Sequence, residues 1–233
     1  MKLARTTRRA RAFTLTELAI VVVMLVLLAI GVMYFTAMNQ RPHRYAARTK
    51  CAQNLKLLRL AYLVFANDND DKYPFLVTNS LAYGNVTQTW LHFQAMSNEC
   101  ASAKILICPS DRERLPNRMS DFGEGASATA ASLSTKSNAA VSYFASLEAD
   151  ETLPNVILSG DRHLLTNRFN MDGRLFLASS NLTSASWTKS QHDGAGNYAL
   201  SDGSVQQATS TALAVQIQQQ GIATNRLLLP LLP

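Results

Sequence analysis

The chain has 233 residues, with 22 Lys and Arg against 16 Asp and Glu, a formal net charge of +6. Residues 1–12 hold five basic residues, residues 41–59 hold six, and neither stretch holds an acid. Beyond residue 60 the balance is reversed, with 11 basic and 15 acidic residues, which argues against a basic nucleic-acid-binding domain. The sequence contains no phosphate-binding loop, no dinucleotide-binding glycine pattern and no metalloprotease motif.

The first predicted element is a membrane-length helix. Residues 18–40 are uncharged over 23 positions, and Glu17 is the only charge between Arg11 and Arg41. As an α-helix this run is roughly 34 Å long, enough to cross a hydrocarbon core of about 30 Å. A cleavable secretory signal would have a shorter apolar region followed by a small-x-small site. A plain signal anchor explains the length and the basic leader, but it does not explain Glu17.

The residues around Glu17 form a motif. A short basic leader ends at Ala12, and Phe13-Thr14-Leu15-Thr16-Glu17-Leu18 then opens the apolar run. This stretch resembles the prepilin-type processing motif of type IV pilins and type II secretion pseudopilins. The resemblance implies that a prepilin peptidase cuts between Ala12 and Phe13 and methylates the new amino group of Phe13. The family usually has Gly where this chain has Ala12, and more often Ile where it has Thr16.

The resemblance also implies a role for the charge of Glu17 in the assembly of subunits. Cleavage frees an α-amino group at Phe13, in or near the membrane. The carboxylate can neutralise that amine in the same subunit or in a neighbour, since either charge alone is costly there. Pairing with a neighbour would set the stagger between subunits of a filament, so Glu17 is the predicted assembly residue.

We divide the chain into a leader (1–12), a transmembrane and assembly segment (13–40), the soluble half of a long helix (41–66) and a globular domain (67–233). Pro42 is expected to kink or interrupt the helix. Beyond it, apolar residues at three- and four-residue steps predict one buried stripe: Cys51, Leu55, Leu58, Tyr62 and Phe65. The polar run at 67–71 is expected to end the helix. It fails the EF-hand pattern, because it lacks the Gly and the final Glu.

The globular domain is expected to be mainly β. Asp202-Gly203 between the β-prone runs 197–201 and 204–209 strongly predicts a hairpin. A tail strand over 225–230 is expected at a sheet edge, ended by Pro230. The other expected elements are a short helix in 88–98, a buried strand over 104–108, a loop over 123–140, strands in 141–147, 156–159 and 174–178, and a short helix in 211–220.

The three cysteines, Cys51, Cys100 and Cys108, allow three choices of one disulfide, and their spacing matches no zinc site. Four stretches further resemble pseudopilin-type proteins abundant in Verrucomicrobia: 51–56, 107–111, 159–162, and His192 followed ten residues later by Asp202-Gly203. In those proteins the first two stretches both carry a Cys. The resemblance therefore favours a Cys51–Cys108 disulfide, with a local Cys100–Cys108 bridge as the rival.

The remaining polar residues suggest little chemistry. His192, Asp193, Ser201 and Asp202 could be arranged as a hydrolase-like set, but no nucleophile elbow accompanies them. His192 is instead expected to brace the hairpin through bonds to its backbone. An internal ion pair is expected within residues 161–163. Major pseudopilins bind calcium in a C-terminal loop, and the candidate ligands here are Asp193, Asn197 and Asp202.

The sequence thus predicts an α+β, pilin-like fold in which a long N-terminal transmembrane helix packs on a mostly antiparallel β-sheet. The expected function is structural, without enzyme activity or a required cofactor, with calcium as the candidate ion. The protein would be a pseudopilin of a type II secretion-like system for protein transport. Its partners would be a prepilin peptidase, other pseudopilin subunits in a homo- or hetero-filament, an inner-membrane assembly platform and membrane lipid, with no nucleic acid.

The expected location is the inner membrane, crossed once, with a cytoplasmic N-terminus and a periplasmic C-terminal domain. The sequence leaves two alternatives open. A type IV pilus subunit for adhesion, motility or DNA uptake would share the same anchor. A membrane-tethered enzyme or binding domain could also have acquired it.

Overall fold

A computed structural model describes residues 14–77, 88–165, 174–178 and 185–231 of the chain. The predicted processing residues Ala12 and Phe13 lie outside the described residues. The chain divides into two compact units, Met1–His43 and Arg44–Pro233.

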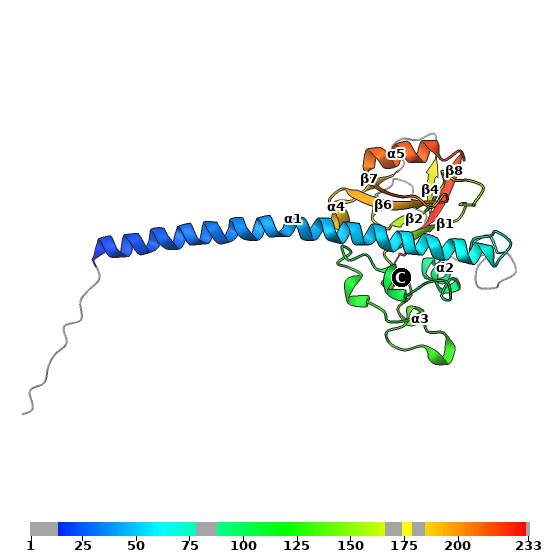
Figure 1. Cartoon of the computed structure of the whole chain (residues 1–233), viewed down its shortest axis with the longest axis horizontal. Coiled ribbons are helices and arrows are strands. Elements are labelled where there is room, and N and C mark those ends of the chain that lie inside the picture. Colours follow the sequence, from blue (N-terminus) through cyan, green and yellow to red (C-terminus); the bar gives the residue numbers. More distant parts are fainter. Residues whose placement is uncertain (1–13, 78–87, 166–173, 179–184, 232–233) are drawn as a thin grey trace, which may run out of the picture. The chain divides into compact units, whose positions relative to one another are not determined.

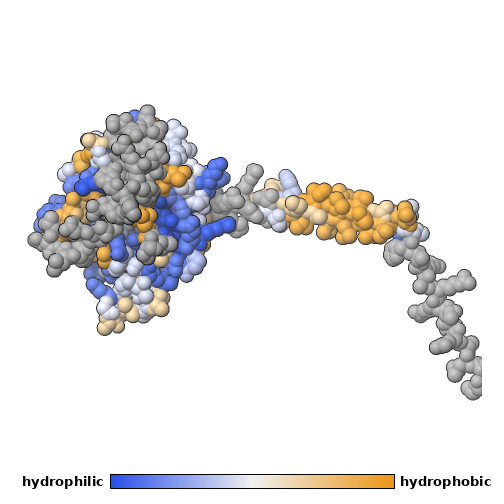
Figure 2. Space-filling view, turned by 180° about the vertical axis from the view of Figure 1, so that it is seen from behind, coloured by the Kyte–Doolittle hydropathy of each residue, from blue (hydrophilic) through white to orange (hydrophobic). Residues whose placement is uncertain are grey.

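The first unit is dominated by the apolar part of helix α1 (Leu15–Asn67). Within the described residues, Leu15–Thr36 is the one helical segment long and apolar enough to cross a membrane, and none of it is buried. Figure 2 shows its apolar side chains as an almost continuous surface on the visible face of the helix. Helix α1 continues through Pro42, so the helix is not interrupted at this residue; of the two predicted outcomes, only a kink stays a prediction.

The second unit is built on the later part of α1. All five residues of the predicted stripe, Cys51, Leu55, Leu58, Tyr62 and Phe65, are buried, which confirms that prediction. The helix ends at Asn67, followed by a turn over 68–71, as expected. Within this unit, α1 runs between the sheet on one side and the segment with α2 (Thr89–Ala95) and α3 (Leu133–Lys136) on the other (Figure 1).

The main sheet has six strands in the order β4-β8-β1-β2-β6-β7, and every neighbouring pair is antiparallel. The expected α+β fold with a mostly antiparallel sheet is therefore confirmed. The strands are β1 (Tyr143–Ser146), β2 (Ile157–Asp161), β4 (Arg174–Ala178), β6 (Ala195–Leu200), β7 (Val205–Thr209) and β8 (Thr224–Leu228). A separate two-stranded sheet pairs β3 (Leu164–Leu165) with β5 (Ser186–Trp187).

Both faces of the main sheet are covered, because successive side chains of a strand point to opposite faces. Tyr143 and Ala145 join the core beneath α1, whereas Phe144 between them joins a second core. That second core contains Leu213 and Ile217 of helix α5 (Ser210–Gln219). The sheet is thus a central layer between α1 and α5.

The hairpin predicted around Asp202-Gly203 is confirmed. Strands β6 and β7 pair from Ala195 opposite Thr209 to Ala199 opposite Val205. Gly203 has a φ of +95°, which glycine adopts without steric cost, and the Asp202 carboxylate accepts a 2.8 Å hydrogen bond from the backbone N–H of Ser204.

Three local predictions are wrong. Residues 105–108 are buried and Lys104 is exposed, but the segment begins with the 3₁₀ helix η1 (Ala103–Leu106), whose first turn is capped by the hydroxyl of Ser102. A short apolar run does not by its period distinguish a strand from a buried helical turn. Residues 123–140 are partly helical, since they contain α3 and the 3₁₀ turns η3 (Gly125–Ser127) and η4 (Ser137–Ala140).

The third error concerns the tail. Strand β8 does not lie at an edge but is inserted between β4 and β1, and it stops at Leu228, so Pro230 never interferes with its pairing. The remaining short elements are η2 (Leu115–Asn117) and α4 (Lys189–His192).

Candidate functional site

Glu17 has a local structural role at the start of α1. Its carboxylate accepts 2.9 Å hydrogen bonds from the backbone N–H and the hydroxyl of Thr14, and the Thr14 hydroxyl accepts a 3.3 Å bond from the N–H of Glu17. This reciprocal arrangement is a capping box, which satisfies N–H groups that have no partner within the helix. The pattern Thr14-x-x-Glu17 is its sequence signal, so a plain anchor would also have a use for Glu17.

A disulfide between Cys51 and Cys108 joins α1 to the chain that follows η1, with the two Cα atoms 5.0 Å apart. This is the pairing that the pseudopilin resemblance implies. Cys100 is a free, buried cysteine. Burial, with a smaller contribution from Glu99, raises the pKa of its thiol to about 12, so it remains protonated and unreactive at neutral pH.

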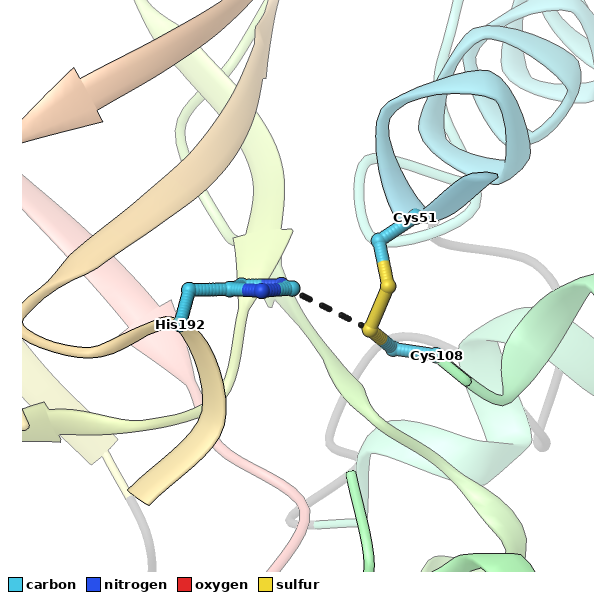
Figure 3. Close-up of side chains that lie close together, drawn as sticks. All are labelled: Cys51, Cys108 and His192. Atoms are coloured by element: carbon cyan, nitrogen blue, oxygen red, sulfur yellow. Dashed lines mark hydrogen bonds between the residues drawn. A yellow bond between two sulfur atoms is a disulfide. The ribbon is translucent and has the colours of Figure 1, made fainter. Parts of the chain in front are cut away.

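His192 lies against this disulfide (Figure 3). Its Nε2 atom is 3.5 Å from the Sγ of Cys108, 3.2 Å from the Nδ2 of Asn197 and 3.2 Å from the Oδ2 of Asp161. These contacts are to side chains, so the expected bonding to the hairpin backbone is wrong. His192 instead connects the C-terminal hairpin to the disulfide on α1.

Asp161 is almost fully buried, at 1% exposure, and is held by the hairpin. Its Oδ2 accepts hydrogen bonds from the backbone N–H of Asn197 at 2.7 Å and from the Nδ2 of the same residue at 2.9 Å. Its Oδ1 accepts a 3.3 Å bond from Gln191. We call Cys51, Cys108, Asp161, His192 and Asn197 the disulfide–histidine cluster.

A second cluster lies around Asp111, whose side chain is buried. Arg162 donates to both of its carboxylate oxygens, at 2.7 and 3.0 Å, and also to Glu113, while His163 Nε2 lies 3.4 Å from Oδ1 of Asp111. Burial alone would raise the pKa of Asp111. The hydrogen bonds and charges of His163 and Arg162 outweigh this and hold the pKa well below its usual range.

These contacts overturn the expected internal ion pair within residues 161–163. Arg162 and His163 both face Asp111, whereas Asp161 faces the disulfide–histidine cluster. Because a guanidinium occupies both Asp111 oxygens, the Asp111 cluster is better suited to holding segments together than to binding a cation.

The hydrolase-like set and the calcium set are not assembled. Both sets contain Asp193 and Asp202, which lie at opposite ends of β6. At about 3.3 Å per strand residue their backbones are roughly 20 Å or more apart, whereas calcium ligands lie about 2.3–2.6 Å from the ion. Asn197 is fully buried inside the disulfide–histidine cluster, and Ser201 bonds to the carbonyl of Val156. The calcium prediction at these residues is therefore not supported.

The four stretches that carry the narrower resemblance converge in space. Cys51 bonds to Cys108, Cys108 contacts His192, His192 contacts Asp161, and Arg162 pairs with Asp111. Sequence reasoning missed the role of Asn197 as the donor that fixes Asp161. Its only signal was its position in the strand between His192 and Asp202.

Comparison with known proteins adds no further identification. No family model, no curated protein and no solved structure matches this chain. The resemblance to prepilin-like proteins therefore remains a prediction from the quoted motifs.

Proposed function

We propose that the chain is a pseudopilin: a membrane-anchored structural subunit that a prepilin peptidase matures and that assembles through its N-terminal helix. The observation that carries the proposal is the segment Leu15–Thr36, whose apolar side chains are all exposed and whose only charge is Glu17 in the first turn. Such a surface requires lipid or other helices around it. In the proposed filament of a type II secretion-like system, the neighbouring subunits supply those helices.

The second unit supports the same function. Its polar clusters tie α1 to the sheet and to the chain after η1, which is what a rigid subunit body requires. A disulfide between Cys51 and Cys108 suits an oxidising compartment, in keeping with the proposed periplasmic location of this unit. The leader would then remain cytoplasmic, and the inner-membrane assembly platform would supply the energy for assembly.

The first test is the intact mass and N-terminal sequence of the protein recovered from membranes of its own cells. The expected product begins at N-methylated Phe13. The Ala12→Gly variant, which restores the residue usual in the family, serves as the positive control for cleavage. A wild-type chain that keeps Met1 while Ala12→Gly is cleaved would refute processing of the natural protein.

The second test separates the two roles of Glu17. Glu17→Gln keeps an oxygen that can accept the Thr14 hydrogen bonds but removes the charge. Thr14→Val removes the capping hydroxyl but keeps the charge. We expect Glu17→Gln to be processed but not incorporated into cross-linkable filaments, and Thr14→Val to assemble. If Glu17→Gln assembles like the wild type, Glu17 is only a capping residue and its assembly role is refuted.

A further inference from the structure

The disulfide–histidine cluster contains the side chains of a soft-metal site. Cys51 comes from α1, Cys108 follows η1, and His192 ends α4, yet their sulfur and ring nitrogen atoms all lie within 4.8 Å of one another. Both cysteines are fully buried, and His192 is 9% exposed. Such a convergence of three separate elements on one point is a condition for a protein metal site.

Two distances from His192 match those between ligands of a tetrahedral zinc ion. With Zn–S near 2.3 Å and Zn–N or Zn–O near 2.0–2.1 Å, a sulfur and a nitrogen ligand lie about 3.5 Å apart, and a nitrogen and an oxygen ligand about 3.3 Å apart. Here His192 Nε2 is 3.5 Å from Cys108 Sγ and 3.2 Å from Asp161 Oδ2. Cys51 belongs to the set of three atoms within 4.8 Å of one another, and Asp161 borders that set through its contact with His192.

The charges around Asp161 also favour a cation. Among the described residues, the only ion-pair partner found for this buried carboxylate is His192, which carries a charge only when protonated. The buried Oδ1 of Asn197 and Oε1 of Gln191 have no hydrogen-bond partner within the described part of the chain. Arg162, the nearest cation in sequence, is directed to Asp111 instead. Two buried oxygen atoms beside Asp161 are therefore left without a donor among the described residues.

We propose that the dithiol form of this protein binds one zinc-type divalent cation through Cys51, Cys108, His192 and Asp161, and that the disulfide form does not. Binding displaces the two thiol protons to solvent, and the sulfur atoms move apart to about 3.8 Å, the separation of two thiolates on tetrahedral zinc. Thiol–disulfide exchange with an external disulfide then forms the Cys51–Cys108 bond and releases the cation, and the external disulfide takes up two protons from solvent as it is reduced to two thiols. The metal would thus occupy the site before the disulfide forms and would leave when it does.

The test uses the full chain in detergent, either oxidised or reduced with a phosphine, and titrated with Zn²⁺ against a chromophoric chelator. We expect one Zn²⁺ per reduced chain and none per oxidised chain. Cys108→Ser and His192→Ala should each weaken binding by more than about 100-fold, because even loss of a group that only supports a ligand costs 10–100-fold. Cys100→Ser is the matched control and should bind like the wild type. Co²⁺ should give a thiolate-to-metal absorption band in the reduced chain alone.

Several results would overturn the proposal. One is equal binding by oxidised and reduced chains, which would place the ion elsewhere, with the Asp111 cluster checked by His163→Ala. Another is unchanged binding by His192→Ala. Should the variants fail to fold, the thermal midpoint of the reduced wild type decides the question: it should rise with Zn²⁺, while that of the oxidised chain should not. No rise in the reduced chain refutes the site.

Discussion

The disulfide should provide a large part of the stability of the second unit. Cys51 and Cys108 are 57 positions apart in the sequence. In the chain-entropy model, closing a loop of this length removes about 14 cal/mol/K of entropy from the unfolded chain, or about 4 kcal/mol at 25 °C. Since a single domain is typically stable by only about 5–15 kcal/mol, reduction should remove between about a quarter and most of the stability of this unit.

The cleanest comparison is between the oxidised and the reduced wild-type chain, because it leaves no foreign side chain in the core. A chelator should be present so that bound metal does not replace the lost constraint. Urea unfolding can be followed by the fluorescence of Trp187, which is buried at 5% exposure beside β6. The free energy of unfolding should fall by about 4 kcal/mol on reduction. Cys100→Ser should show the same fall, because Cys100 is outside the bond.

Two results would contradict this reasoning. A difference below about 1 kcal/mol would mean that the loop is already constrained in the unfolded chain. A non-reducing peptide map that links Cys100 to Cys108 would mean that the local rival bridge forms instead, and the reductant would then act on a different loop.

The other predictions concern Asp111 and the close approach at Gly160. Arg162→Met should cost about 3–5 kcal/mol in urea unfolding, because it leaves the buried Asp111 carboxylate without its bidentate partner, whereas the double variant with Asp111→Asn should recover part of that loss. The pKa of Asp111 lies below its usual value of 3.8. The ionised carboxylate should therefore contribute fully to the free energy of unfolding above about pH 5, and this contribution should decline as the pH falls below about 4. If an Asp111→Asn chain lost the same free energy of unfolding in acid, this prediction would be refuted. Gly160→Ala should cost about 1–3 kcal/mol, because the added Cβ would lie 2.7 Å from the Phe144 ring and 2.9 Å from the carbonyl oxygen of Asn197. An unchanged thermal midpoint would show that both the ring and the neighbouring strand can move away.

The sequence was sufficient to predict an element correctly where a single local rule determines the structure. The stripe from Cys51 to Phe65 followed from helical periodicity, and the β6–β7 hairpin from the backbone preference of Asp202-Gly203. The bounds of β4, Arg174–Ala178, were also predicted correctly, from a short apolar run around Phe176.

The failures arose where partners from distant parts of the chain decide the outcome. Residues 103–106 form a 3₁₀ helix instead of a strand. The two residues that follow it are held by α1: the carbonyl of Ile107 accepts a hydrogen bond from Asn54, and Cys108 forms the disulfide. Likewise, β8 enters the middle of the sheet because β4 and β1 both offer edges to it. The side-chain partners of His192 could not be derived from its local sequence, since Cys108 lies 84 residues away.

The central position of β8 also constrains the order in which the protein can form. The N-terminal neighbour of β8 in the sheet, β1, is completed at Ser146, but their pairing awaits the synthesis of residues 224–228. The same region closes the rest of the unit, since Thr89, Arg114 and Asn138 donate hydrogen bonds to the carbonyls of Leu228, Pro230 and Leu231. A nascent chain halted before residue 224 therefore cannot complete this sheet. Completion of the sheet is therefore a late step, which has to wait until residues 224–228 have been synthesised.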